Sequence, residues 1–282
     1  MPVRLLFQDE ARFGCLSDHR RCWAPWPARP VLGQQVIREY VYGLAAVGPQ
    51  DGKFSALVLP WVDAEAMSVF LAQTQELAHR YRALARDCQS ITLAFDKGNN
   101  SVRNQEVLDA SGFHFVGSLV PTHYADLLAI PLSEFRPLND PRLKPTLVLR
   151  LSREVWGQER TLLLTFSPEL QRKQIRGVEQ HLAKKRRALR ELQAKLNRSQ
   201  KPHAKGKGYT RESLAQHLQQ ICSGQHLSQI RRTLVSKRRG RLRLTYRTDA
   251  AAWARIQKTQ LGKRILFTDQ QGWTNEQIVL AY

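Results

Sequence analysis

The sequence predicts an α/β fold, and three observations support this. Short stretches of alternating apolar residues, typical of strands, recur through the N-terminal part of the 282-residue chain. Segments with helical spacing separate the later strands, which is the pattern of helical crossovers. Hydrophobic residues make up 42% of the chain, enough for a core, while no apolar run reaches the roughly 20 residues that a membrane span needs.

Strands and helices are predicted in a definite order before residue 132. Strands are expected at residues 3–8, 37–47, 53–60, 91–95 and 113–120. Helices are expected at residues 63–87, with Asp63 as the N-cap, and at residues 101–111. This order matches the ribonuclease-H-like fold, in which carboxylates at the ends of the first and fourth strands lie side by side.

A basic insertion is predicted at residues 133–260, between a core at 1–132 and a return to the core at 261–282. A hairpin should turn near Gly157, and a long helix should run from Pro168 to about Asn197. This helix is expected either to form a coiled-coil arm or to pack on its own domain. The prediction continues with a helix at 211–222 and strands at 241–247 and 264–269. It also includes an N-cap at Asp249 and a capping box from Thr274 to Gln277.

The net charge of +20 is concentrated in one segment. Residues 171–247 contain 22 Lys or Arg and only 3 Asp or Glu. Such a segment attracts polyanions, and phosphate backbones are the usual target. The alternative is a solvated helix face, although such faces normally mix both signs. The predicted nucleic-acid-binding residues are Lys97, Lys184, Lys185, Arg186, Arg187, Lys205, Lys207, Lys237, Arg238 and Arg239.

Two aspartates at predicted strand ends, Asp9 and Asp96, are the candidate catalytic and metal-binding residues. Phosphodiester chemistry with divalent metals needs carboxylates on rigid supports, and Mg²⁺ prefers oxygen ligands. Under the alternative interpretation, Asp96 caps the next helix and Asp9 is a turn residue. Lys97 beside Asp96 either holds a scissile phosphate or faces solvent.

The remaining candidates are weaker. Cys15, His19 and Cys22 have a spacing that zinc accepts, but no fourth ligand lies near them in the sequence. Trp23 and Trp26 are expected either to stack on bases or to be partly buried in a loop. Cys88, Cys222 and the other two cysteines are expected to be reduced thiols of a cytosolic protein, since no export signal is visible.

Several motifs resemble those of bacterial insertion-sequence transposases. FQDEARFG, RCWAP, ARP and EYVYGLAAV resemble the opening of the catalytic domain in mariner-like transposases, which implies that Asp9 is the first metal ligand. FDKGNNSVRN and GFHFVGSLVPTHY resemble the second-aspartate region of another group, in which a large insertion precedes the final glutamate. That resemblance implies that Asp96 is the second ligand. LGKRILFTDQQGWTNEQIVLAY resembles the stretch leading to that glutamate.

The resemblance implies a DDE-type transposase that uses Mg²⁺ or Mn²⁺, binds insertion-sequence ends and target DNA, and acts as a homo-oligomer without a membrane. It implies a cytoplasmic, nucleoid-associated protein. It also places the final glutamate shortly after the tyrosine matching Tyr282, so neither Glu10 nor Glu276 is expected to replace it. The printed chain is thus expected to be truncated at both ends, as a fragment, a split frame or a decayed gene. The alternatives are an inactive remnant that only binds DNA and an RNA-binding protein.

Overall fold

The computed structural model describes residues 3–14, 39–50, 52, 54–84, 90–201 and 208–282. The chain is mixed α/β, with a large mixed sheet and several helices, which confirms the predicted class. It divides into two compact units. The first contains Met1–Val120, Arg150–Leu164 and Ile265–Tyr282, and the second contains Pro121–Leu149 and Thr165–Arg264.

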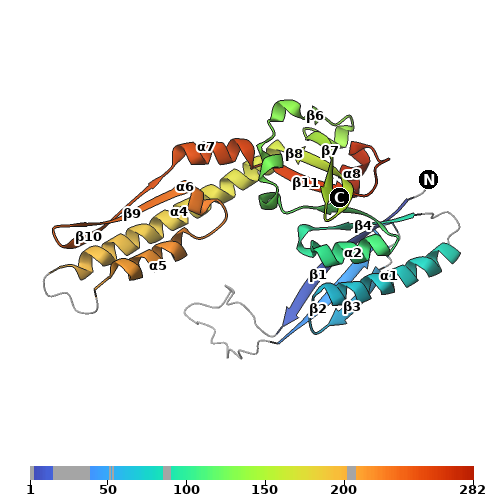
Figure 1. Ribbon diagram of the computed structural model, residues 1–282, viewed down its shortest axis with the longest axis horizontal. Helices are drawn as coiled ribbons and strands as arrows, with labels where there is room; N and C mark the ends of the chain where they lie inside the picture. Colours follow the sequence, from blue (N-terminus) through green and yellow to red (C-terminus); the bar gives the residue numbers. More distant parts are fainter. Residues whose placement is uncertain (1–2, 15–38, 51, 53, 85–89, 202–207) are drawn as a thin grey trace, which may run out of the picture. The chain divides into compact units, whose positions relative to one another are not determined.

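The first unit is built on a sheet with strand order β3-β2-β1-β4-β5-β11-β8-β7 (Figure 1). β1 pairs with β2, and β2 with β3, in antiparallel fashion, whereas β1, β4 and β5 run parallel to one another. β11 pairs antiparallel with β5. The strands are β1 (Val3–Gly14), β2 (Tyr40–Val47), β3 (Phe54–Leu59), β4 (Ser90–Phe95), β5 (His114–Ser118), β7 (Leu147–Val155), β8 (Gln158–Phe166) and β11 (Lys263–Thr268).

The structure differs from the prediction in two places. β1 does not end at residue 8, because its antiparallel pairing with β2 continues as far as Gly14. Asp9 therefore lies within a strand, and the turn interpretation of this residue is wrong. The hairpin of β7 and β8, placed by the predicted ranges in the insertion, lies mostly in the first unit, where β8 is hydrogen-bonded beside β11. Its turn at Trp156 and Gly157 was predicted, and both residues have positive φ, as a two-residue hairpin turn requires.

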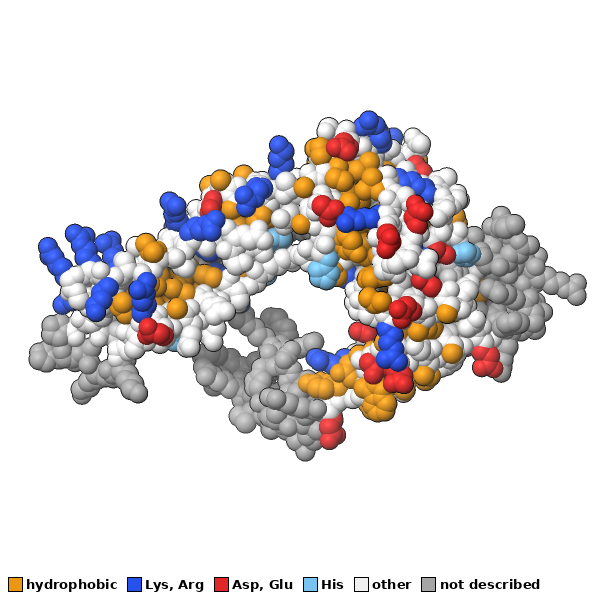
Figure 2. Space-filling model, viewed as in Figure 1, with side chains coloured by type: hydrophobic (Ala, Val, Ile, Leu, Met, Phe, Trp, Pro, Cys, Tyr) orange, Lys and Arg blue, Asp and Glu red, His pale blue; other side chains and the backbone are white. Residues whose placement is uncertain are grey.

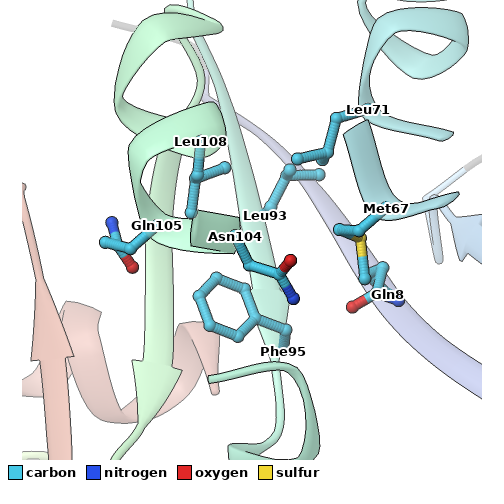
Figure 3. Close-up of a pocket in the computed structure, with 8 residues that line it drawn as sticks. All are labelled: Gln8, Met67, Leu71, Leu93, Phe95, Asn104, Gln105 and Leu108. Atoms are coloured by element: carbon cyan, nitrogen blue, oxygen red, sulfur yellow. The ribbon is translucent and has the colours of Figure 1, made fainter. Parts of the chain in front are cut away.

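Helices α1 (Ala64–Leu84) and α2 (Val102–Ala110) cover one face of β1 and β4 (Figure 1). Asp63 caps α1, since its Oδ1 accepts a hydrogen bond of 2.8 Å from the Ala66 amide. Between these helices and strands lies a cavity of about 20 Å³, large enough for about one water molecule (Figure 3). Side chains from both helices and both strands line it: Gln8, Met67, Leu71, Leu93, Phe95, Asn104, Gln105 and Leu108.

The parallel strands are held by close packing on this same face. The rings of Phe95, Phe115 and Phe267 lie with centroids 5.1 to 6.0 Å apart. Gly117 lies between them, and a Cβ there would come within 2.6 Å of ring atoms of Phe95 and Phe267. Only glycine fits this position, so the end of β5 is held tightly against β4 and β11.

The second unit is organised around the long helix α4, which the sequence predicted. Buried leucines of α4 pack in one cluster on α5 and β10 and in another on α6 and α7, so the packed-helix alternative is the observed one (Figure 1). Elements of this unit are α3 (Ala125–Ala129), β6 (Arg136–Pro137), α4 (Pro168–Ser199), α5 (Arg211–Cys222), α6 (Leu227–Ile230), β9 (Arg231–Arg238), β10 (Arg241–Thr248) and α7 (Ala250–Thr259).

Helix caps and short 3-10 turns lie in the segments that connect the helices and strands. Asp249 caps α7, and a capping box formed by Thr274 and Gln277 begins α8 (Asn275–Ala281), both as predicted. Single 3-10 turns lie at Lys97–Asn99, Pro121–His123, Leu132–Glu134 and Pro141–Leu143. Within the described ranges, no helix has both the length and the apolar character needed to cross a membrane.

Candidate metal centre and nucleic-acid interface

The strand register sets Asp9 beside Asp96. The parallel pairing of β1 with β4 ends at Gln8 and Phe95, and the next residues along the two strands are the aspartates. Adjacent strands lie about 4.8 Å apart. Gln8 and Phe95 point into the cavity under α1 and α2 (Figure 3), and Asp96 keeps an extended backbone (φ −81°, ψ 166°). Because side chains alternate along a strand, both carboxylates project from the opposite face.

Two hydroxyl groups hold the carboxylate of Asp96. The Ser118 hydroxyl, at the end of β5, donates to Oδ1 of Asp96 at 3.0 Å. The Tyr282 hydroxyl, just after α8, lies 3.2 Å from the same oxygen and 2.9 Å from Ser118 Oγ, and donates its proton to one of them. Oδ2 of Asp96 takes part in neither contact. The sequence did not predict these roles for Ser118 and Tyr282, because they depend on contacts between residues far apart in the chain.

The capping interpretation of Asp96 is wrong. Its side chain accepts a hydrogen bond from the amide of the adjacent Lys97 but none of the cap type, which would come from a residue further into the turn at Lys97–Asn99. Helix α2 is capped instead by Ser101, whose Oγ accepts from the Asn104 amide at 3.1 Å. The turn itself is tied to β5, since the Asn100 side chain donates to the Ser118 carbonyl at 2.5 Å. Asp96 is therefore available for a role other than starting a helix.

The surroundings of Asp96 favour its ionised form. Partial burial acts to raise the pKa of Asp96, but hydrogen bonds from the Lys97 amide and from the hydroxyls of Ser118 and Tyr282 oppose this, as does the charge of Lys97. The net effect is a pKa below the ordinary value of an aspartate. The carboxylate is thus charged at neutral pH, as a metal ligand must be.

Substituting Ser118 with alanine is expected to raise the pKa of Asp96, because one hydrogen bond to the charged form is lost. Since the folded-state pKa lies below the unfolded one, this group stabilises the fold at pH above its unfolded pKa. That stabilisation is lost as the pH falls through the folded pKa. In Ser118→Ala the stabilisation should be smaller, and its loss should be complete at a higher pH, because the unfolded pKa at which the loss begins is unchanged. A carbon-detected NMR titration of the Asp96 carboxyl, together with unfolding at several acidic pH values, measures both effects.

Ser152→Ala is the matched control for this titration. The Ser152 hydroxyl donates to a different carboxylate, that of Glu159, at 2.7 Å. Its removal should leave the Asp96 titration unchanged. An unchanged Asp96 pKa in Ser118→Ala would mean that the hydroxyl does not stabilise the carboxylate.

The donor set suits a hard divalent cation. Two carboxylates on neighbouring strands supply oxygen ligands, and Mg²⁺ needs only one or two carboxylates because it keeps several waters. Among the described residues, no group of three or more His, Cys, Asp or Glu side chains is placed to hold a metal. Asp9 and Asp96 are the side chains that could hold such a cation, with water completing its coordination. Lys97 is exposed directly after Asp96, where its charge would face an approaching phosphate.

A separate basic surface lies on the β-hairpin of the second unit. In β10, the inward residues Leu242, Leu244 and Tyr246 pack against α4 and α5. The alternate residues Arg241, Arg243, Thr245 and Arg247 are exposed, and three of these four are arginines. In Figure 2, Lys and Arg side chains gather over the part of this unit that holds β9 and β10. We call this surface the hairpin face, and it consists of Arg238, Arg241, Arg243 and Arg247.

The hairpin face includes residues that the predicted set omitted. Of the predicted residues Lys237, Arg238 and Arg239, only Arg238 lies on the hairpin face, where it is paired in register with Arg241. Lys237 is paired with Leu242 and so belongs to the opposite side, and Arg239 forms the turn with φ of 49°. Like charges opposite one another destabilise a hairpin, and a bound polyanion would remove that cost. The period-two alternation of Arg241, Arg243 and Arg247 was the signal in the sequence.

The other predicted cations do not form one surface. Because α4 turns through about 100° per residue, Lys184, Lys185, Arg186 and Arg187 point in different directions. Arg187 pairs with Glu191 at 3.3 Å, while Lys184 and Lys185 line a cleft in the second unit. Six of the predicted positions lie outside the described residues: Cys15, His19, Cys22, Cys88, Lys205 and Lys207. The same holds for Trp23 and Trp26.

No protein-family model matches the chain, and comparisons with curated proteins and with solved structures give no match either.

Proposed function

We propose that the protein is a DDE-type transposase whose first unit is a ribonuclease-H-like core. One observation carries this proposal: the register of β1 and β4 sets two carboxylates side by side on adjacent parallel strands. The strand order β3-β2-β1-β4-β5, with α1 and α2 as the crossovers, agrees with that fold. The transposase motifs in the sequence include both aspartates.

Each of these residues would have a separate role in phosphodiester cleavage and strand transfer. Asp9 and Asp96 would hold Mg²⁺ or Mn²⁺, and Ser118 and Tyr282 keep Asp96 in one orientation. When bound, the metal would activate the attacking water or DNA 3′ hydroxyl and stabilise the leaving oxygen. Lys97 would attract the scissile phosphate. The hairpin face would bind the DNA backbone without reading its sequence.

A DNA-binding protein without chemistry is the second candidate. The absence of a third suitably placed metal ligand among the described residues favours it. This candidate keeps the hairpin face and its strong dependence on salt. It differs from the first in one measurable property, which is cleavage that depends on a divalent metal.

A plasmid-nicking assay separates the two candidates. Supercoiled DNA carrying candidate terminal repeats is incubated with the protein in Mg²⁺, Mn²⁺ or EDTA. The assay is run on the 282-residue chain. Nicking in Mg²⁺ or Mn²⁺ but not in EDTA supports the enzyme. DNA binding without nicking supports the second candidate, and preferential binding of RNA contradicts both.

A further inference from the structure

We propose that the second unit carries a nucleotide-binding cleft between α4 and the segment that joins α5 to α6. The cleft has a volume of about 680 Å³, within the range of small-molecule sites. One wall is a face of α4, and the other is formed by the end of α5 and residues 223–227. This inference does not depend on metal binding by the two aspartates.

The charge of the cleft is positive. Lys184 and Lys185 line it together with His181 and His226, and none of its lining residues is an aspartate or a glutamate. Burial lowers the pKa of His226, so this ring offers a neutral hydrogen-bonding nitrogen at pH 7 while the lysines carry the charge. A cleft with two ammonium groups and no carboxylate fits an anion such as a phosphate.

Arg231 is a further cation close to the cleft, since it acts on Cys222 together with Lys185. Arg231 is only 7% exposed, and its guanidinium donates to the Leu182 carbonyl at 2.8 Å and to the Thr248 hydroxyl at 2.9 Å rather than to a carboxylate. Burial raises the pKa of the neighbouring Cys222 thiol, and the charges of Arg231 and Lys185 oppose that rise. The positive charge near the cleft is therefore not neutralised by these partners.

The arrangement along α4 indicates the shape of the ligand. The lysines lie seven residues after Gly177 and Val178, which is about 10 Å along a helix with a rise of 1.5 Å per residue. Around that second position the lining is apolar and amide-bearing, from Val178 and Gln174 of α4 and from Leu227, whose cluster Val178 packs against. A ligand with an anion at one end and a flat hydrogen-bonding body at the other satisfies both regions. A nucleotide has this form, either free or as part of a single strand.

Two variants test the two ends of the cleft. Lys184→Gln with Lys185→Gln removes the charge at the phosphate end. Gly177→Leu fills the other end, where a Cβ meets no atom within 4 Å, and leucine also favours helix over glycine. The matched control is Arg190→Gln with Lys195→Gln, which removes the same charge from exposed positions of α4 outside the cleft.

Binding is measured by calorimetry with deoxyadenosine 5′-monophosphate in EDTA and about 150 mM salt, which suppresses diffuse binding to surface charges. We expect one saturable site, a loss of about tenfold or more in each cleft variant, and an unchanged affinity in the control. A labelled, 5′-phosphorylated pentadeoxyadenylate shows whether the bound nucleotide is free or belongs to a single strand. Tighter binding of this strand, with competition by the mononucleotide, indicates a nucleotide of a strand, whereas binding of the mononucleotide alone indicates a free nucleotide.

Three results would overturn the inference: no saturable binding of the mononucleotide, an equal loss in the cleft variants and the control, or binding of polyglutamate in place of the nucleotide. Because the assay contains EDTA, Asp96→Asn should bind the mononucleotide as the wild type does. The two experiments are therefore independent. A failure to bind the mononucleotide does not change the interpretation of the nicking assay, and a failure to nick does not change the interpretation of the binding assay.

Discussion

Asp96→Asn is expected to lower metal-dependent nicking by about a thousandfold, the largest effect that we expect from a single substitution. Asparagine has nearly the same shape and can still accept from Ser118 and Tyr282, so the packing at the end of β4 should remain. It lacks the negative charge that a divalent cation requires. Losing one metal ligand costs several kcal/mol of transition-state stabilisation, which corresponds to this factor in rate.

Controls separate this effect from unfolding and from loss of DNA binding. Glu10→Gln removes a carboxylate from the next position of β1, on the other face of the strand, and should nick as the wild type does. Asp96→Asn should keep its melting temperature and its affinity for DNA. If it cleaved at the rate of the wild type, Asp96 would not be a metal ligand.

The triple variant Arg241→Gln, Arg243→Gln, Arg247→Gln is expected to weaken DNA binding by about a hundredfold at low salt. The three side chains lie on the exposed side of β10, whereas the alternate residues hold the strand on α4 and α5. Each phosphate contact contributes about 0.9 to the slope of log affinity against log salt concentration. The slope should therefore fall by about 3, as measured by fluorescence anisotropy at several salt concentrations.

A variant with the same net charge tests whether position matters. Arg103, Arg255 and Arg264 are exposed arginines outside the basic segment, and replacing all three with glutamine removes equal charge. This control should change the affinity by less than about threefold and leave the salt slope nearly unaltered. Equal effects of the two triple variants would show that net charge, and not the hairpin face, determines binding.

Local sequence determined most of the elements and their ends. Asp63, Ser101 and Asp249 accept backbone hydrogen bonds within three residues, so each cap could be predicted from its neighbours. The buried side of α4 repeats at the spacing that the sequence shows, and Gly157 ends β7 because a tight hairpin turn needs positive φ. These features depend on interactions over a few residues, which a single sequence contains.

Tertiary structure decided how distant residues meet. Asp9 and Asp96 are neighbours because of the pairing register of β1 with β4, and Tyr282 reaches Asp96 because of the position of α8. The sequence predicted the two aspartates as a pair only through the resemblance and the strand order, and did not predict Tyr282. It likewise assigned Lys184 to a general basic surface, whereas packing of α4 against α5 places it in a cleft. Such contacts depend on strand register and helix packing, which short-range periodicity does not specify.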